Sequence, residues 1–315
     1  MTVWRLQTRT QGSLTDYCYK NKVAAMGWSF CKEEKITEEM RKSIQTIEDY
    51  CNTVKRYGVY KNYSCVERFA KEIKSNDIIW MRDTKGIYYI GRVGEESKWT
   101  FNNDAYDIDA CNQRTDINWI KLTEKGDESC IPGAVTTAFI KGRTLQKIKN
   151  ENIATYSAIL YNELSGKNYY SNTSVELTES NFYSLLSPSD CEDLLYSWLY
   201  KQFGYICVPS TNKLSTPNYE CVLLDPQTAD KRIYIQVKNG EDNDYTKIDA
   251  DDYAELNGEV WFLKTHGKVT HIEKYTDRMF TANSKELFEF ACSEESNNIL
   301  SPSIKTWVKF MKDHK

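Results

Sequence analysis

Residues 232–238, RIYIQVK, constrain the fold most, because apolar and polar side chains alternate there with a period of two. Successive side chains of a β-strand point to opposite faces, so the aliphatic residues share one face and Tyr234, Gln236 and Lys238 share the other. An apolar run at 221–224, CVLL, precedes this segment, and a turn-rich DPQTADK joins the two. The pattern predicts a β-hairpin.

Glu220 opens the first strand of this hairpin and can reach Gln236 and Lys238 at one end of the sheet. Magnesium prefers oxygen ligands, so a carboxylate and an amide oxygen could hold it against a phosphate. The lysine could then orient water or stabilise charge that develops on the phosphate. The same spacing also fits an ordinary hairpin with solvated charges at the strand ends, and both interpretations stay open on spacing alone.

The elements around the hairpin follow an α/β order. A helix is expected within 187–205, with Ser187 or Ser189 as its N-cap and Gly204 at its end. A helix around 249–256, a strand at 259–265 and C-terminal helices follow the hairpin. Asp225 and Asp230 are rival acids, and their position favours a role in the turn.

The first 148 residues are rich in short strands, which suits a small barrel. We expect strands at 3–8, 23–29, 77–93 (a hairpin), 99–103, 117–122 and 131–139. Helices are expected at 13–22 with Ser13 as N-cap, at 37–57, at 66–73 and at 142–164. The polar, Gly/Ser/Asn-rich stretch that follows is expected to be a linker over 165–184, which separates domains at 1–164 and 185–315.

Composition narrows the classes of function. The net charge of −4 and pI near 5.6 argue against a protein that coats nucleic acid by bulk electrostatics, although a local basic groove remains possible. Ten cysteines without a CxxC pair, and only three histidines, make a structural zinc site improbable and indicate reduced thiols packed in the core. Without an apolar N-terminal segment or a membrane-spanning run, the expected location is the cytoplasm.

The second half resembles the PD-(D/E)xK nuclease core, most closely the Mrr-like restriction endonucleases. The matching residues lie between about 185 and 265: Glu192 on the helix, Gly204 and Tyr205 after it, Glu220, and Gln236 with Lys238. The family usually carries Asp after a Gly-rich turn where this chain has Glu220. The resemblance implies an α/β nuclease fold, catalytic roles for Glu192, Glu220, Gln236 and Lys238, and Mg²⁺ or Mn²⁺ held by the two glutamates and Gln236.

The first half resembles the EVE and YTH group of PUA-like barrels. The matching pieces include MTVWRLQT, KNKVAAMGWSF, GIYYIGRV and IPGAVTTAFIKGRTLQKI. The resemblance implies an α+β barrel with helices that holds a flipped, often methylated base, with Trp28, Ser29 and Trp99 at the pocket. Trp4, Trp80 and Trp119 are expected in the core instead. Lys141, Arg143 and Lys147 could contact phosphate, although a solvated helix start explains them equally well.

Together the two resemblances imply a modification-dependent, type IV-like DNA endonuclease that serves in phage defence. A homodimer is expected if both strands are cut. One alternative is a binding protein for modified nucleic acid whose nuclease-like domain is inactive or needs a partner. Another is a protein directed to RNA, since YTH-type pockets also accept modified RNA bases.

Overall fold

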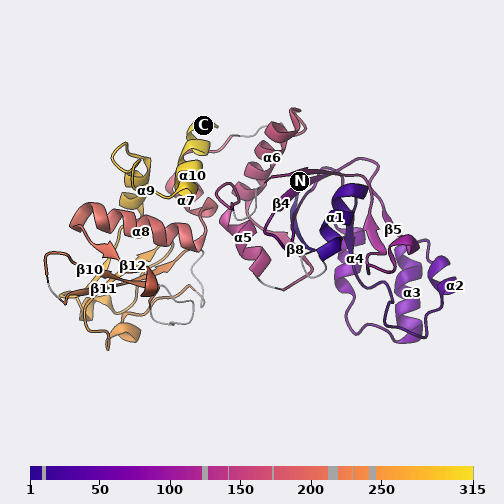
Figure 1. The fold of residues 1–315 in the computed structure, drawn as a ribbon, viewed down its shortest axis with the longest axis horizontal. Helices are drawn as coiled ribbons and strands as arrows, with labels where there is room; N and C mark the ends of the chain where they lie inside the picture. Colours follow the sequence, from indigo (N-terminus) through magenta and orange to yellow (C-terminus); the bar gives the residue numbers. More distant parts are fainter. Residues whose placement is uncertain are drawn as a thin grey trace. The chain divides into compact units, whose positions relative to one another are not determined.

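The computed structural model describes residues 1–8, 12–122, 127–140, 142–171, 174–211, 219–228, 230–240 and 246–314, with residues 12 and 13 described by their backbone alone. The chain divides into two compact units (Figure 1). The first comprises residues 1–128 and 135–173, and the second comprises residues 129–134 and 174–315. Both mix α-helices with β-sheet. No helix in the described ranges is long and apolar enough to cross a membrane.

The first unit contains two sheets. The larger has the order β7-β4-β3-β1-β8, with β1 parallel to β3 and the other neighbours antiparallel. The smaller has the order β2-β6-β5. The strands are β1 Val3–Gln7, β2 Ala24–Met26, β3 Ile78–Arg82, β4 Tyr88–Val93, β5 Trp99–Phe101, β6 Asn112–Arg114, β7 Ile117–Lys121 and β8 Leu145–Ile148.

The expected closed barrel is therefore not found among the described residues. A barrel requires the two outer strands of a sheet to be joined by hydrogen bonds, directly or through further strands. Here β7 and β8 are the outer strands of the larger sheet, and no described ladder joins them to each other or to the smaller sheet. The strands of the smaller sheet span three residues each, which gives them few bonds with which to bridge the gap.

The helices of the first unit correct three expectations. They are α1 Gly12–Asn21, α2 Glu38–Lys42, α3 Ile47–Tyr57, α4 Ser64–Lys71, α5 Gly133–Ile140 (shared with the second unit), α6 Glu151–Ser165 and the 3₁₀ helix η1 Asn103–Ala105. The helix expected at 37–57 is broken, because Thr46 is extended and caps α3 in a box with Asp49. The helix expected at 142–164 is instead β8 followed by α6, which Asn150 caps. α1 begins at Gly12, ahead of the expected cap Ser13.

The segment 131–139, expected as a strand, forms α5. A short apolar run without alternation does not separate strand from helix. Pro132 stands just before the helix, where its missing N–H costs no hydrogen bond. Phe139 then packs edge to face on Tyr88 of β4, with ring centroids 5.6 Å apart. Tertiary packing therefore decides this element.

Trp4, Trp80 and Trp119 are core residues, as predicted from their apolar neighbours. Each buried indole N–H is also satisfied. Trp4 donates to Asp77 at 3.0 Å, Trp80 donates to Ser157 at 3.1 Å, and Trp119 donates to the carbonyl of Val23 at 2.8 Å. These bonds tie the larger sheet to α6 and to the start of β2.

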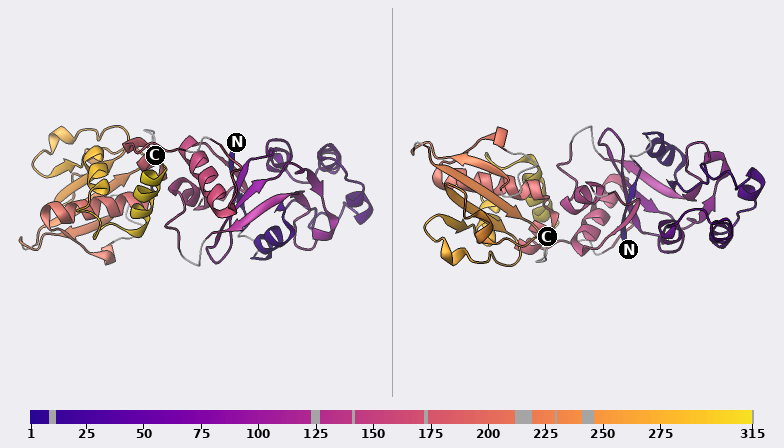
Figure 2. Two further views of the ribbon diagram at one scale, coloured as in Figure 1. Left: turned by 90° about the horizontal axis from the view of Figure 1, so that it is seen from above. Right: turned by 90° about the horizontal axis from the view of Figure 1, so that it is seen from below.

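The second unit is built on one mixed sheet with the order β13-β12-β11-β10-β9. The predicted hairpin of β10 and β11 is confirmed as antiparallel, while β11, β12 and β13 run parallel. The strands are β9 Ile206–Cys207, β10 Cys221–Leu224, β11 Arg232–Lys238, β12 Glu259–Lys264 and β13 Met279–Thr281. Helices α8 Pro188–Phe203, α9 Ser284–Cys292 and α10 Pro302–Asp313 lie on one side of this sheet (Figures 1 and 2).

The other face of this sheet is covered by loops and by the 3₁₀ helix η3 Ala250–Tyr253, where a longer helix was expected. Two further 3₁₀ helices are η2 Pro209–Thr211 and η4 Ile272–Lys274. The expected linker at 165–184 also contains structure, since α7 Glu179–Leu185 begins there and is capped by Thr178. Thr178 caps this helix, and its residues Phe182, Tyr183 and Leu185 are buried, so a helix forms within a stretch that is polar overall.

Candidate functional site

The hairpin brings Glu220 to Gln236 and Lys238. The backbone N–H of Glu220 donates to the carbonyl of Ile235 at 2.8 Å, which fixes the register one residue beyond the Cys221–Ile235 pair. Gln236 Nε2 then donates to Glu220 Oε1 at 2.7 Å. Lys238 Nζ lies 3.9 Å from the same oxygen. A carboxylate, an amide and an ammonium therefore meet at one end of β10 and β11.

The end of β11 is held against the start of α8 by Asn239. Its Nδ2 donates to the carbonyls of Tyr183 and Leu186, both at 3.1 Å, and Thr265 Oγ1 donates to its Oδ1 at 2.8 Å. Leu186 directly precedes the cap of α8. The neighbour of Lys238 is thus fixed to the chain segment that leads into the acidic helix.

Ser187 is the N-cap of α8, so the structure selects it over Ser189, the other expected cap. Ser187 Oγ accepts the N–H of Asp190 at 3.0 Å, and the carboxylate of Asp190 accepts from the N–H of Ser187 at 2.8 Å, which forms a capping box. Pro188 occupies the first helical position. Glu192 follows in the next turn and is half-buried.

The electrostatics of Glu192 link it to the hairpin. Burial, and after it the negative charges of Glu220 and Asp193, raise the pKa of Glu192 to about 7, while Lys238 opposes the shift. The four residues that the sequence predicts as catalytic therefore share one electrostatic environment, although they come from α8 and from both strands of the hairpin.

The donor set of this cluster fits a hard divalent cation. Two carboxylates and an amide supply oxygen ligands of the kind that Mg²⁺ and Mn²⁺ take. Burial is the main cause of the raised pKa of Glu192, and the nearby charge of Glu220 adds to it, so a cation bound here would lower that pKa. Gln236 is 2% exposed, so its amide sits where water competes little.

The rival acids lie in the turn, as expected. Asp225 Oδ1 accepts the N–H of Gln227 at 2.9 Å, which is ordinary turn chemistry. Asp230 has a φ of 62°, a left-handed turn conformation. Lys231, next to Asp230 in the turn, forms an ion pair with Glu259, with Nζ 2.8 Å from Oε1.

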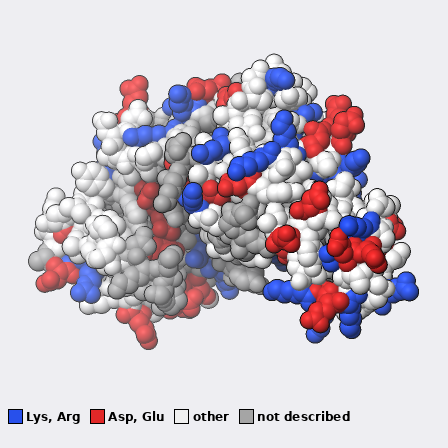
Figure 3. Space-filling model, turned by 45° about the vertical axis from the view of Figure 1, so that its right-hand side comes forward, with Lys and Arg blue, Asp and Glu red and all other residues white. Residues whose placement is uncertain are grey.

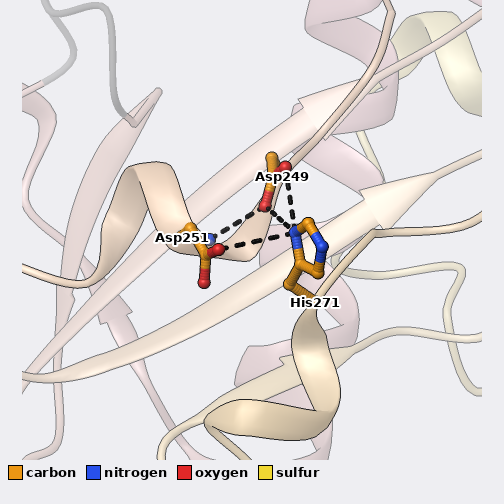
Figure 4. Close-up of side chains that lie close together, drawn as sticks. All are labelled: Asp249, Asp251 and His271. Atoms are coloured by element: carbon orange, nitrogen blue, oxygen red, sulfur yellow. Dashed lines mark hydrogen bonds and ion pairs between the residues drawn. The ribbon is translucent and has the colours of Figure 1, made fainter.

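A second polar cluster, which the sequence did not reveal, joins Asp249, Asp251 and His271 (Figure 4). His271 Nδ1 lies 2.9 Å from Asp249 Oδ1 and 3.5 Å from Asp251 Oδ2. Lys274 Nζ is 2.8 Å from Asp251 Oδ2, and the Tyr275 hydroxyl donates to Asp251 Oδ1 at 3.0 Å. These groups already compensate one another, so the cluster fastens η3 to η4. No signal in the sequence marks this cluster, because two aspartates two residues apart and a histidine 20 residues later match no recognised motif.

The first unit contains a cavity of about 630 Å³. Trp28 lines it, as the base-pocket hypothesis expects, together with Gln7, Gly27, Lys32, Tyr60 and Asp109. Ser29 is fully buried behind the wall, where its Oγ accepts the N–H of Cys111 at 2.9 Å. Trp99 is not among the residues that line this cavity, and its ring packs edge to face on Tyr50. The structure thus brings one of the two expected aromatics to the cavity.

The wall of the cavity has an unusual backbone. Trp28, Tyr60 and Asp109 have φ values of 62°, 46° and 48°. This region is uncommon for residues other than glycine, and a bulky side chain there is an outlier. Such conformations persist where the surrounding structure enforces them, and they gather at functional sites.

Of the residues expected to contact phosphate, Arg143 lies at one rim of the cavity. Gly142 and Thr144 line it, and Arg143 between them is exposed. Lys147 is exposed on β8 rather than on a helix, and Lys141 lies outside the described residues. On the face drawn in Figure 3, basic and acidic side chains are interspersed, which agrees with the weakly acidic composition.

The cysteines are all free thiols. Cys18, Cys51, Cys111, Cys191 and Cys221 are buried, as expected of core residues. Cys31 is exposed and lines the cavity, which corrects that expectation. Burial of its sulfur, followed by the charge of Asp109, raises the pKa of Cys31 to about 11, so the thiol stays protonated.

The fold and these sites define a chain of two mixed α and β units, one with an acid–amide–lysine cluster and one with an aromatic-walled cavity. Residues 4–137, less than half of the chain, match a family model described as a domain of unknown function, DUF8426. A search of solved structures returns a "DNA modification-dependent restriction endonuclease AspBHI" at a TM-score of 0.20 and 7% identity, over 75% of this chain and 68% of that chain. A TM-score of this size does not define a common fold. No curated protein matches the chain.

Proposed function

We propose that the protein is a metal-dependent endonuclease that cuts DNA carrying a modified base. The observation that supports this most is the convergence of Glu192 of α8, Glu220 just before β10, and Gln236 and Lys238 of β11. The order of these residues and of their elements also resembles the Mrr-like PD-(D/E)xK nucleases.

In this proposal each residue has a separate role. Glu220, Glu192 and Gln236 would hold Mg²⁺ or Mn²⁺, which, when bound, would lower the pKa of a water and neutralise charge on the phosphate. Lys238, 3.9 Å from Glu220, would supply the positive charge that stabilises negative charge developing on the attacked phosphate. Gln236 donates to Glu220 at 2.7 Å and keeps that carboxylate oriented.

The cavity of the first unit would receive the modified base after it leaves the duplex. Unstacking a base costs a few kcal/mol, and stacking on an aromatic ring returns about 1 to 3 kcal/mol. Trp28 lines the cavity and would be the ring that stacks on the base. Arg143 and Lys147 are exposed and would contact phosphate next to the flipped nucleotide. Because one active site cuts one strand, cleavage of both strands would require a homodimer. We propose that this dimer acts in the cytoplasm against foreign DNA.

The test is cleavage of plasmid DNA prepared with and without modified bases, in Mg²⁺ or Mn²⁺. Parent protein should nick or linearise the modified plasmid. Lys238→Ala should reduce the rate by about 10² to 10³-fold, as expected when one stabiliser of transition-state charge is removed. Lys285→Ala, a lysine with its side chain 72% exposed in the same unit, is the matched control and should cut at the parental rate.

The result that would refute the enzyme is equal cleavage by Lys238→Ala and parent, or cleavage by neither with any divalent metal. If neither cuts but both bind modified DNA, the protein is a binding module with an inactive or partner-dependent nuclease-like unit. Tighter binding to RNA of matched sequence and modification would instead assign RNA as the ligand.

A further inference from the structure

The cavity of the first unit contains a buried hydrogen-bond acceptor that the protein leaves unused. Gln7, the last residue of β1, is 7% exposed and lines the cavity. Among the described residues its Oε1 has no hydrogen-bond partner. Buried polar atoms are almost always paired, so an orphan acceptor at a cavity wall calls for a donor from a ligand.

A second acceptor, Asp109, lines the same cavity. Its Oδ1 accepts from the N–H of Ser29 at 2.9 Å and from Cys31 Sγ at 3.7 Å, so the carboxylate is held in a fixed orientation. The hydrogen bonds of Asp109 within the described part of the chain go to Oδ1, so the Oδ2 of this half-buried carboxylate is available to a ligand. A Cβ at position 27 would come within 2.7 Å of that oxygen, so Gly27 leaves the room that Asp109 occupies.

The remaining walls are largely apolar and fixed in place. Trp28 and Tyr60 line the cavity with Met26 and Leu14. The ring of Tyr60 stacks on Phe30, with centroids 5.5 Å apart, and its hydroxyl accepts the N–H of Phe30 at 2.7 Å. Lys32, also at the cavity, is exposed and supplies hydrogen-bond donors. The site is therefore an aromatic slot with the acceptors of Gln7 and Asp109 in its wall, and the charged side chains of Lys32 and Glu33 also line it.

We propose that this cavity reads a flipped cytosine that is modified on ring carbon 5 and keeps its exocyclic amino group free, with Gln7 Oε1 and Asp109 Oδ2 accepting from that amino group. The inference rests on the proposed function, since it names the base that the reading unit selects. A carboxylate is a natural acceptor for the N4 amino group of cytosine. Lys32 can donate to the ring carbonyl.

The chemistry separates this ligand from the other modified bases. Methylation of the amino nitrogen, as in N4-methylcytosine or N6-methyladenine, removes one donor and sets a methyl group against an acceptor. A thymine-like base presents a single ring N–H between two carbonyls, which would face the carboxylate. A substituent on carbon 5 leaves the amino group intact and meets the apolar wall.

The experiment is a binding titration of the full chain in EDTA, so that cleavage plays no part. Fluorescent duplexes of one sequence carry 5-methylcytosine, N4-methylcytosine, N6-methyladenine or no modification. We expect the 5-methylcytosine duplex to bind at least tenfold more tightly than either amino-methylated duplex and about fourfold more tightly than the unmodified one, as burial of a single methyl group implies. Equal or tighter binding of either amino-methylated duplex would overturn the inference.

Substitutions test the two acceptors. Gln7→Met keeps the side-chain length without the acceptor, and Asp109→Asn keeps the shape, so each should weaken binding of the 5-methylcytosine duplex about tenfold or more. Glu34→Gln, an exposed acid that is not among the residues lining the cavity, should bind like the parent. Parental affinity in both Gln7→Met and Asp109→Asn would refute the assignment.

Two readouts keep the outcomes distinct. Gln7→Met should unfold at the parental temperature or above it, because the removed oxygen has no partner in the protein, so lost binding is not lost folding. Cleavage of DNA that carries only N6-methyladenine would leave the nuclease standing and refute the cytosine reading. Selective binding of 5-methylcytosine without cleavage would support the cytosine reading and refute the nuclease.

Discussion

Glu192→Gln in the metal-free protein tests the central electrostatic claim of the nuclease site. The pKa of Glu192 rises from 4.5 to about 7 on folding, mainly by burial and then by the charge of Glu220. Since the folded state binds the proton more tightly than the unfolded state, this group favours folding below about pH 4.5 and loses that advantage as the pH rises to about 7.

The magnitude follows from the shift. At about 1.4 kcal/mol per pKa unit, a shift of this size corresponds to about 3 kcal/mol between the two protonation states. The carboxylate is only half-buried, so solvent screening reduces the expected effect to about 1 to 2 kcal/mol. Glutamine cannot ionise, so the variant should be more stable than the parent by this amount at pH 8 and close to it at pH 5.

The assay is urea unfolding in EDTA at pH 5, 6, 7 and 8, with tryptophan fluorescence as the signal. Glu294→Gln, an exposed acid in the same unit, is the control and should follow the parent at every pH. Added Mg²⁺ at pH 8 should stabilise the parent more than Glu192→Gln. Identical pH profiles for parent and Glu192→Gln would show that Glu192 does not carry the raised pKa, and the reasoning would fail.

Two further predictions concern the frameworks of the two units. Ser157→Ala removes the acceptor of the buried Trp80 indole, so it should lower the free energy of unfolding by about 1 to 3 kcal/mol in urea titrations, and an unchanged midpoint would contradict the bond. Gly258→Ala places a Cβ 2.3 Å from the carbonyl oxygen of Arg232 at a φ of 155°, so it should destabilise the second unit by about 2 kcal/mol or more. Gly142→Ala, whose added Cβ meets nothing within 4 Å, is its control, and equal effects of the two would refute the close approach.

Local sequence rules predicted the second unit well around its site. The period of two in 232–238 placed Gln236 and Lys238 on one face, and the turn composition before it set the hairpin. The sequence offered Ser187 or Ser189 as the cap of α8 and Gly204 as its end, and the capping box of Ser187 with Asp190 selects the first. Such signals are readable because both partners of each interaction lie within a few residues of one another.

The secondary structure and strand pairing of the first unit were harder to predict from the sequence. The apolar segment at 131–139 became α5, and the segment after 142 became β8 and α6, because packing partners from other parts of the chain chose between strand and helix. The expected barrel depended on which strands pair across long separations, and the described sheets remain open. Trp99 matched a family position, yet its ring packs against Tyr50 rather than at the cavity.

The sequence by itself indicated that Gln236 and Lys238 share one face of a strand and that a helix begins near Ser187, since strand periodicity and helix caps are local effects. Only the tertiary structure decided that Glu192 shares the electrostatic environment of Glu220, because burial and charge proximity arise when α8 packs on the hairpin. The same holds for Gln7 and Asp109, which lie far apart in the chain and meet at one cavity. Whether a buried acceptor finds a hydrogen-bond partner depends on which groups surround it, and these surroundings exist only in the folded chain.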